Sequence, residues 1–235
     1  MSQVNLNLNG KEIVLLGTAH VSRESIEEVT SAVESEKPDC VAIELDDKRL
    51  ANLEDPEAWR KMDIVKVLRN KQGFLMMANL VLSSYQKRIG EDTGVKPGDE
   101  MLAAIQKARA LGIKCAMVDR PIAVTLRRAW AKNSFWGKCK LLSALVASAF
   151  SKEEVSSESI EDLKKRSEMD SMMTELSTYL PTVKEVLIDE RDRYLATHIW
   201  LCEGTSVLAV LGAGHLPGVA SHLKRLASSE ESTDC

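Results

Sequence analysis

Two stretches of the chain share one pattern of hydrophobic and polar positions. In each, a short apolar run is followed by Gly-x-x-His: Ile13 to Leu16 leads to His20, and Ser206 to Leu211 leads to His215. Short continuous apolar runs bounded by glycine are typical of strands that are buried on both faces of a parallel sheet. Because ligands bind at the carboxyl ends of such strands, we predict that the two histidines line one site.

Polar and apolar residues alternate at the N-terminus, where the apolar residues at positions 4, 6 and 8 are separated by asparagines. Asn9-Gly10 follows, and this pair predicts a hairpin because both central positions of a tight hairpin turn need a positive φ. We therefore expect residues 4–8 to pair antiparallel with residues 11–16 at one edge of the sheet.

The apolar run Cys40 to Leu45 predicts another buried strand, which follows a helical pattern over residues 22–37. Strand, helix and strand joined by short links form a right-handed βαβ unit. We therefore predict that the strand over residues 13–16 and the strand over residues 40–45 are parallel neighbours. Glu44 would then emerge beside His20.

A third strand of this kind is predicted at Ile113 to Val118, where it follows a helix over residues 99–111 and ends in Asp119-Arg120. The elements together predict an α/β fold, a mixed and mostly parallel sheet with helices on both faces, in a single domain over residues 1–235. The stretch from about residue 121 to residue 204 is too long for a simple crossover. It is expected to be a large helical insertion that covers the site.

Within that insertion, Pro181 opens a long helix that runs to Cys202. On a wheel of 100° per residue, Arg191 falls inside the apolar arc of this helix, whereas Asp192 faces outward. An unpaired buried charge is costly. Arg191 is therefore expected either in a structural ion pair or on a substrate carboxylate.

Composition narrows the class of protein. The 31 basic and 35 acidic side chains give a net charge of −4, so no basic excess points to a nucleic-acid partner. The five cysteines show no C-x-x-C pair, which indicates reduced thiols in a cytosolic protein. The N-terminus is polar, and the longest apolar runs are shorter than the roughly 20 residues that cross a bilayer. We expect a cytoplasmic protein, or a membrane-associated one if the chain is part of a longer protein.

Each of the four predicted parallel strands ends in side chains that can hold a metal or move a proton. His20, His215 and Glu44 form a donor set that commonly binds a divalent metal, with Asp119 as a further ligand. In the metal-free alternative, Glu44 orients His20, which then acts as a general base on water. Arg120 either forms a surface salt bridge or clamps an anion. The residues alone leave these alternatives open.

Five motifs occur in order along the chain: LLGTAHVS, AIELDDKR, DRP, ERDRYLA and LGAGHLPGV. Together they resemble the TraB/PrgY family, which is grouped with the TIKI peptidases and, more distantly, with erythromycin esterase and ChaN-like proteins. The resemblance covers most of residues 12–225. It implies that His20, Glu44 and His215 are core active-site positions, and it adds Arg49, Arg191 and Tyr194.

The resemblance also implies a function. The TIKI branch suggests metal-dependent peptide hydrolysis, and the pheromone-shutdown branch suggests that a peptide is blocked or sequestered. We therefore expect a metal-dependent hydrolase that acts on peptides, with a non-catalytic peptide-binding module or a metal-free esterase-like hydrolase as alternatives. The expected cofactor is manganese, cobalt or zinc. Relatives often carry hydrophobic helices after this domain, so membrane attachment is expected in longer members and not through this chain.

The expected partners are a peptide or small-molecule substrate and, as an open question, a second copy of the chain. The expected site residues fall into three roles: catalytic, Glu44 and His20; metal-binding, His20, His215, Glu44 and Asp119; substrate-binding, Arg49, Arg120, Arg191 and Tyr194.

Overall fold

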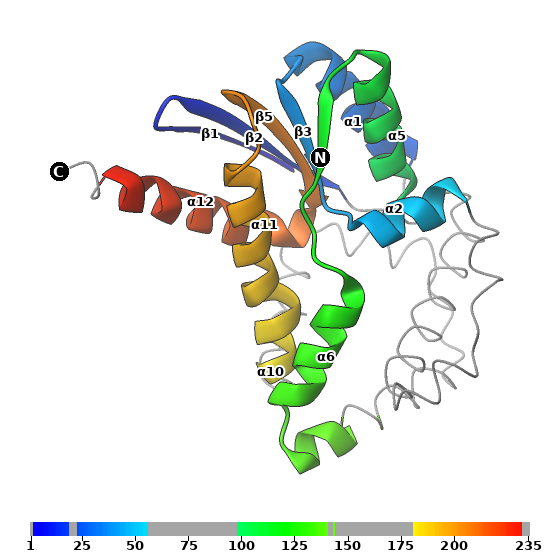
Figure 1. Cartoon of the computed structure of the whole chain (residues 1–235), viewed down its shortest axis with the longest axis vertical. Coiled ribbons are helices and arrows are strands. Elements are labelled where there is room, and N and C mark those ends of the chain that lie inside the picture. The colour runs from blue at the N-terminus through cyan, green and yellow to red at the C-terminus, as the bar shows by residue number, and fades with distance from the viewer. Residues whose placement is uncertain (1, 19–22, 56–97, 141–142, 144–180, 232–235) are drawn as a thin grey trace.

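The computed structural model describes residues 2–18, 23–55, 98–140, 143 and 181–231 (Figure 1). Within these residues the fold is α/β, built on one mixed and mostly parallel sheet. Its strands are β1 (Ser2–Leu8), β2 (Lys11–Thr18), β3 (Cys40–Ile43), β4 (Lys114–Met117) and β5 (Ser206–Gly212). They lie in the order β1-β2-β5-β3-β4.

The hairpin between β1 and β2 is confirmed. Asn9 and Gly10 have φ values of 49° and 77° and form the turn, and Leu8 faces Lys11 across the ladder. The pairing is antiparallel and places β1 at the edge of the sheet. The Asn-Gly pair therefore sets the register of the first two strands.

Strand β5 lies at the centre of the sheet. It pairs in parallel with β2, so that Thr18 faces Gly212, and it pairs in parallel with β3 on its other side. The prediction that the two Gly-x-x-His strands run the same way in one sheet is confirmed. The prediction that β2 and β3 are neighbours is wrong, because the last strand of the chain enters between them. Val207 to Leu211 are almost completely buried, which suits the position where both faces and both edges are covered.

The helices form two layers, one on each face of the sheet (Figure 1). Side chains alternate along β5, so that Leu208 and Val210 pack with one layer and Val207, Ala209 and Leu211 with the other. The first layer contains α1 (Arg23–Glu36) and α5 (Asp99–Ala110), and the second contains α11 (Glu190–Trp200) and α12 (Leu216–Glu231). The remaining helices are α2 (Asp47–Glu54), α6 (Ile122–Lys132) and α10 (Pro181–Lys184). In the part of the chain described here, no helix has both the length and the apolar character needed to cross a bilayer.

The predicted helical insertion contributes α6, α10 and α11 to the described residues, and residues 144–180 lie outside them. A π-helical turn, Glu185–Asp189, joins α10 to α11. A π turn adds one residue to the helix, which rotates the following face by about 100° relative to a regular wheel. Asp192 is consequently only 4% exposed and Leu201 is 70% exposed. The prediction that Asp192 faces outward is therefore wrong.

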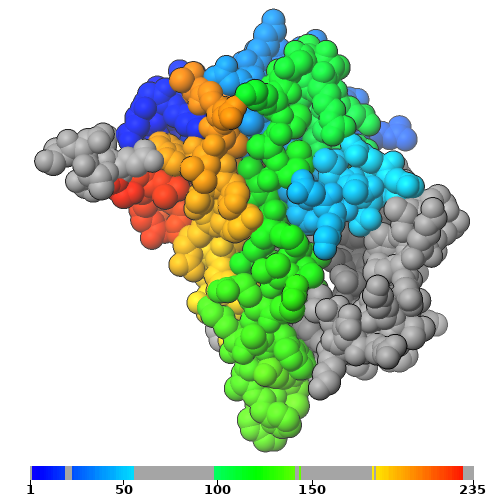
Figure 2. Space-filling model, viewed as in Figure 1, coloured from blue at the N-terminus to red at the C-terminus, as the bar shows by residue number. Residues whose placement is uncertain are grey.

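Glu190 joins α11 to α6. Its carboxylate accepts hydrogen bonds from Arg128 Nε at 2.7 Å, Lys132 Nζ at 2.9 Å and Arg120 Nη1 at 3.3 Å. Hydrogen bonds from Arg128, and then from Lys132 and Arg120, outweigh the cost of burial and hold the pKa of Glu190 well below its ordinary value. The two helices lie side by side in the space-filling view (Figure 2).

We expect Glu190→Gln to lower the free energy of unfolding by about 1–3 kcal/mol at pH 7, because buried donors lose a charged acceptor. A lowered folded-state pKa stabilises the fold above the unfolded pKa of about 4.3 and loses this effect as the pH falls further. The difference in the free energy of unfolding between variant and wild type, measured by urea titration, should therefore be smaller at pH 3 to 4 than at pH 7. Glu185→Gln is the control, because Glu185 is half-exposed and bonds Lys132. An equal loss at pH 7 and pH 3 would contradict the assignment.

Candidate functional site

Five polar side chains meet where the carboxyl ends of β3, β4 and β5 approach α11. We call this set the acid–arginine cluster; its members are Glu44, Asp119, Arg191, Asp192 and His215. The three carboxylates are buried, at 4%, 7% and 4% exposure. The cluster thus combines three carboxylates, one guanidinium and one imidazole in a site with little water.

Glu44 extends strand β3 by one residue beyond Ile43. Its neighbours Ile43 and Leu45 pack with the α1–α5 layer, so the strand alternation turns Glu44 toward α11. Its backbone N–H donates to Val210 O at 3.1 Å, and its Oε2 accepts from the N–H of Gly212 at 2.6 Å. The carboxylate is therefore fixed against the turn that follows β5, where the second Gly-x-x-His motif lies.

Arg191 is the centre of the cluster. Its Nε and Nη2 donate to the two oxygens of Asp119 at 2.9 and 2.6 Å, and Nη2 also donates to Glu44 Oε1 at 2.5 Å. Burial disfavours the charged guanidinium, but the carboxylates of Glu44 and Asp119 outweigh this and raise the pKa of Arg191 above its ordinary value. Arg191 is therefore a permanent positive charge that ties α11 to the ends of β3 and β4.

His215 ends the short 3₁₀ turn Ala213–His215, and its ring is oriented by Asp192. Nδ1 lies 2.6 Å from Asp192 Oδ1. A carboxylate accepts only, so Nδ1 carries the proton and Nε2 presents its lone pair. This lone pair faces Arg191 Nη1 at 3.0 Å, and Nε2 lies 3.6 Å from Glu44 Oε1. Asp192 is the member of the cluster that the sequence did not predict, because a π turn cannot be recognised from hydrophobic spacing.

Two glycines allow α12 to start this close to the cluster. A Cβ on Gly218 would lie 1.8 Å from Asp192 Oδ2, and a Cβ on Gly17 would lie 2.2 Å from Leu216 Cδ1. Neither position can hold a side chain without displacing its neighbour. The approach of α12 to β2 and to Asp192 therefore depends on both glycines.

Three of the other predicted site residues, Arg49, Arg120 and Tyr194, lie outside the cluster. Arg120 donates to Thr125 Oγ1, Glu190 and Val186 O, and with Tyr194 it lines a groove of about 610 Å³ between α6 and α11. Other residues that line this groove are Arg128, Arg193 and His198, whose ring stacks on that of Tyr194 at 3.9 Å. Arg49 is half-buried in the first turn of α2, where its backbone N–H donates to Asp46. His20 lies outside the described residues, two positions beyond Thr18.

The implied metal can be tested against these atoms. The described residues contain no group of three or more His, Cys, Asp or Glu side chains arranged to hold a metal. Two donors do fit: Glu44 Oε1 and His215 Nε2 are 3.6 Å apart, within the reach of two metal bonds of about 2.0–2.2 Å. Asp192 supports His215 as a carboxylate supports a metal-bound histidine. A metal here would need a third ligand, for which His20 is the candidate. Arg191 would have to give up its hydrogen bonds to Glu44 Oε1 and His215 Nε2 for these atoms to bind the metal.

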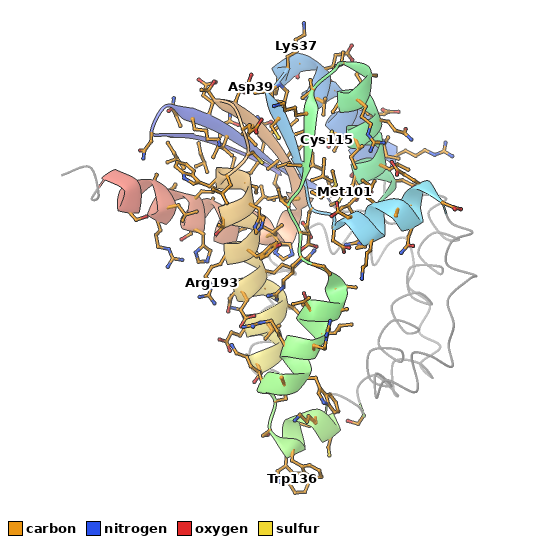
Figure 3. The ribbon with its side chains drawn as sticks, in the orientation of Figure 1. Lys37, Asp39, Met101, Cys115, Trp136 and Arg193 are labelled. Carbon is orange, nitrogen blue, oxygen red and sulfur yellow. The ribbon has the colours of Figure 1, made fainter. Side chains whose placement is uncertain are left out.

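We expect Arg191→Met to lower the free energy of unfolding by about 3–5 kcal/mol, because two buried carboxylates lose their shared cation. Arg191→Lys should recover only part of this, since an ammonium cannot make the two parallel bonds to Asp119. Arg193→Met is the matched control on the same helix, because Arg193 is exposed (Figure 3). Urea unfolding of the three variants measures the difference. Similar losses at both positions would show that the buried pairing has little weight.

Gly218→Ala provides a second test. Helix propensity alone predicts that the substitution raises the free energy of unfolding by up to about 1 kcal/mol. The contact with Asp192 predicts instead that it lowers this free energy by about 1–3 kcal/mol. In an Asp192→Ala background the same substitution should be neutral or stabilising. Thermal unfolding of wild type, the two single variants and the double variant measures this double-mutant cycle. A loss that persists without Asp192 would place the clash elsewhere.

Nearly the whole chain matches one family of known proteins. The profile of the TraB/PrgY/gumN family matches residues 4–231. The chain is 37% identical to an uncharacterised protein of Methanocaldococcus jannaschii over 95% of this chain and 56% of that protein. It is 30% identical to a TraB domain-containing protein of Mus musculus and 29% identical to that of Homo sapiens, over 90% of this chain and 62% of each relative. The chain spans less than two thirds of the length of these relatives. The resemblance drawn from the motifs is confirmed, and the chain belongs to the TraB/PrgY/gumN family.

Proposed function

We propose that this protein is a metal-dependent hydrolase that acts on peptides and that the acid–arginine cluster is its active site. One observation carries the proposal. His215 has its proton fixed on Nδ1 by Asp192, and its free Nε2 lies 3.6 Å from the buried carboxylate of Glu44. An oriented imidazole beside a carboxylate is an arrangement that serves metal binding and proton transfer alike.

The donor set supports a cation. Glu44 and His215 would hold the metal together with His20, which follows the neighbouring strand β2. Within the cluster three carboxylates share one guanidinium, so a divalent cation would offset the acidic excess. Asp46, two residues after Glu44, is also buried, and its Oδ2 has no hydrogen-bond partner among the residues that the structure describes. A bound metal would polarise the substrate carbonyl and lower the pKa of a water.

The residues of the chain have separate roles in this proposal. Asp192 keeps the proton on Nδ1 of His215, so Nε2 stays available as a donor atom. Glu44 acts either as a ligand of the metal or, where it does not bind the metal, as the general base that accepts the proton of the attacking water. Asp119 holds Arg191 by Nε and Nη2 and so fixes the plane of the guanidinium. Its Nη1, which bonds His215 in this structure, is then the donor for the oxyanion that develops on the carbonyl of a bound substrate.

A metal-free hydrolase is the second candidate, and the position of Arg191 favours it. The guanidinium already donates to both Glu44 and His215, at 2.5 and 3.0 Å, and so supplies a positive charge where a metal would lie. Asp192 and His215 would then form the base, and Arg191 would stabilise the oxyanion. A third candidate, peptide binding without turnover, is favoured by the groove between α6 and α11.

The experiment combines metal content with turnover. Protein purified without chelator is analysed for bound metal, titrated with manganese, cobalt and zinc, and assayed on a peptide panel with and without EDTA. We expect near-stoichiometric metal and EDTA-sensitive cleavage, both lost in His20→Ala and His215→Ala. His222→Ala is the control, because His222 lies on α12 and bonds Arg225.

The other results separate the candidates. Cleavage that survives EDTA and disappears in Asp192→Ala and His215→Ala would favour the metal-free hydrolase. Peptide binding without cleavage, in the presence of every metal tested, would favour the binding module. Full activity in His215→Ala would remove the cluster from the mechanism altogether.

A further inference from the structure

Two adjacent aromatic residues, Phe135 and Trp136, follow helix α6 and lie far from the acid–arginine cluster; we call them the aromatic tip. Phe135 and Trp136 are 73% and 76% exposed, and their rings form an edge-to-face pair at 5.9 Å. Trp136 is at the extreme end of the molecule, opposite the sheet (Figure 3). Two large adjacent apolar side chains at such exposure are unusual on a surface that contacts only water.

The turn that presents these side chains is well ordered by its own hydrogen bonds. Residues 135–140 are helical, and Ser134 begins them: its carbonyl accepts from Lys138 N at 2.9 Å and its hydroxyl accepts from Gly137 N at 3.2 Å. A Cβ on Gly137 would lie 2.6 Å from Asn133 Oδ1, so the turn is tight. The aromatic pair is therefore held outward at the first turn of a helix.

Along the sequence, the charged residues next to the tip are all basic. Between Pro121 and Phe150 the sequence has five basic residues and no Asp or Glu, although the whole chain carries −4. Two of the five bind Glu190. Arg127 and Lys140 are exposed, and Lys138 Nζ lies over the ring of Trp130 at 5.6 Å. Three of the seven Trp and Phe residues of the chain fall within Trp130–Trp136.

We propose that this tip docks the protein on an anionic lipid surface, a property beyond the proposed hydrolase function. Trp and Phe partition to the boundary between headgroups and acyl chains, and flanking Lys and Arg pair with lipid phosphates. Among the described residues the tip projects from the molecule (Figure 2), so the exposed aromatic rings can enter a bilayer ahead of the sheet and the helices that cover it. A protein partner would have to supply a matching cavity, whereas a lipid surface adapts to a convex tip.

The test is co-sedimentation of the full chain with phosphatidylcholine vesicles, with and without phosphatidylglycerol. We expect binding to the anionic vesicles that weakens as salt is raised. Phe135→Ser/Trp136→Ser should reduce it by at least about tenfold, because the burial of two aromatic side chains is lost. Phe135→Leu/Trp136→Phe should retain it. Leu201→Ser is the matched control, since Leu201 is 70% exposed but lies at the far end of α11.

Two charge-reversal variants test the contribution of the basic residues near the tip. Lys140→Glu should weaken binding, whereas Lys224→Glu, the same change on α12, should leave it unaltered. Thermal unfolding midpoints check that each variant folds. The proposal is overturned if wild type does not bind anionic vesicles, or if the Leu201 variant loses binding as strongly as the aromatic variant. It is also overturned if the aromatic variant instead splits a dimer seen by size-exclusion chromatography without lipid.

Discussion

The pairing of one mostly buried guanidinium with two buried carboxylates holds this fold together at the carboxyl ends of the strands. Arg191 comes from α11, Glu44 follows β3 and Asp119 follows β4, so a single side chain joins three separate elements. Removing one partner from such a group costs several kcal/mol, a large share of the roughly 5–15 kcal/mol that keeps a domain folded. Arg191 lies between the two buried carboxylates and donates hydrogen bonds to both, so the arrangement of the site and the position of the helix depend on the same contact.

Backbone geometry decides which side chains reach this contact. The π turn at Glu185–Asp189 changes the phase of the helix and brings Asp192 inward beside His215. The absence of a Cβ at Gly218 then leaves room for the Asp192 carboxylate under the first turn of α12. Neither feature adds an interaction by itself. The π turn sets the direction of Asp192 and the missing Cβ leaves room for it, and the hydrogen bond that fixes the His215 ring follows.

Charge is distributed unevenly over the molecule. Three carboxylates and one guanidinium lie at the strand ends, where the proposed metal and substrate would bind. Five basic residues lie on α6 and the helical turn after it, where Glu190 binds two of them and the aromatic tip lies among the rest. The described part of the chain therefore has more negative than positive charge at the strand ends and more positive than negative charge along α6 and the turn after it. A net charge of −4 conceals this division.

The sequence by itself determined most of the local elements and four of the five residues of the acid–arginine cluster. The Asn9-Gly10 turn, the apolar strands and the polar residues at the strand ends depend on short-range preferences and on burial, which a linear pattern records. Glu44, Asp119, Arg191 and His215 were identified in this way, and the structure brings all four together. Only the tertiary structure placed β5 between β2 and β3, because strand order depends on long-range pairing that no local pattern encodes. It also decided the roles of Asp192 and Arg120, since the phase of a helix after a π turn and the partner of a buried arginine are settled by packing.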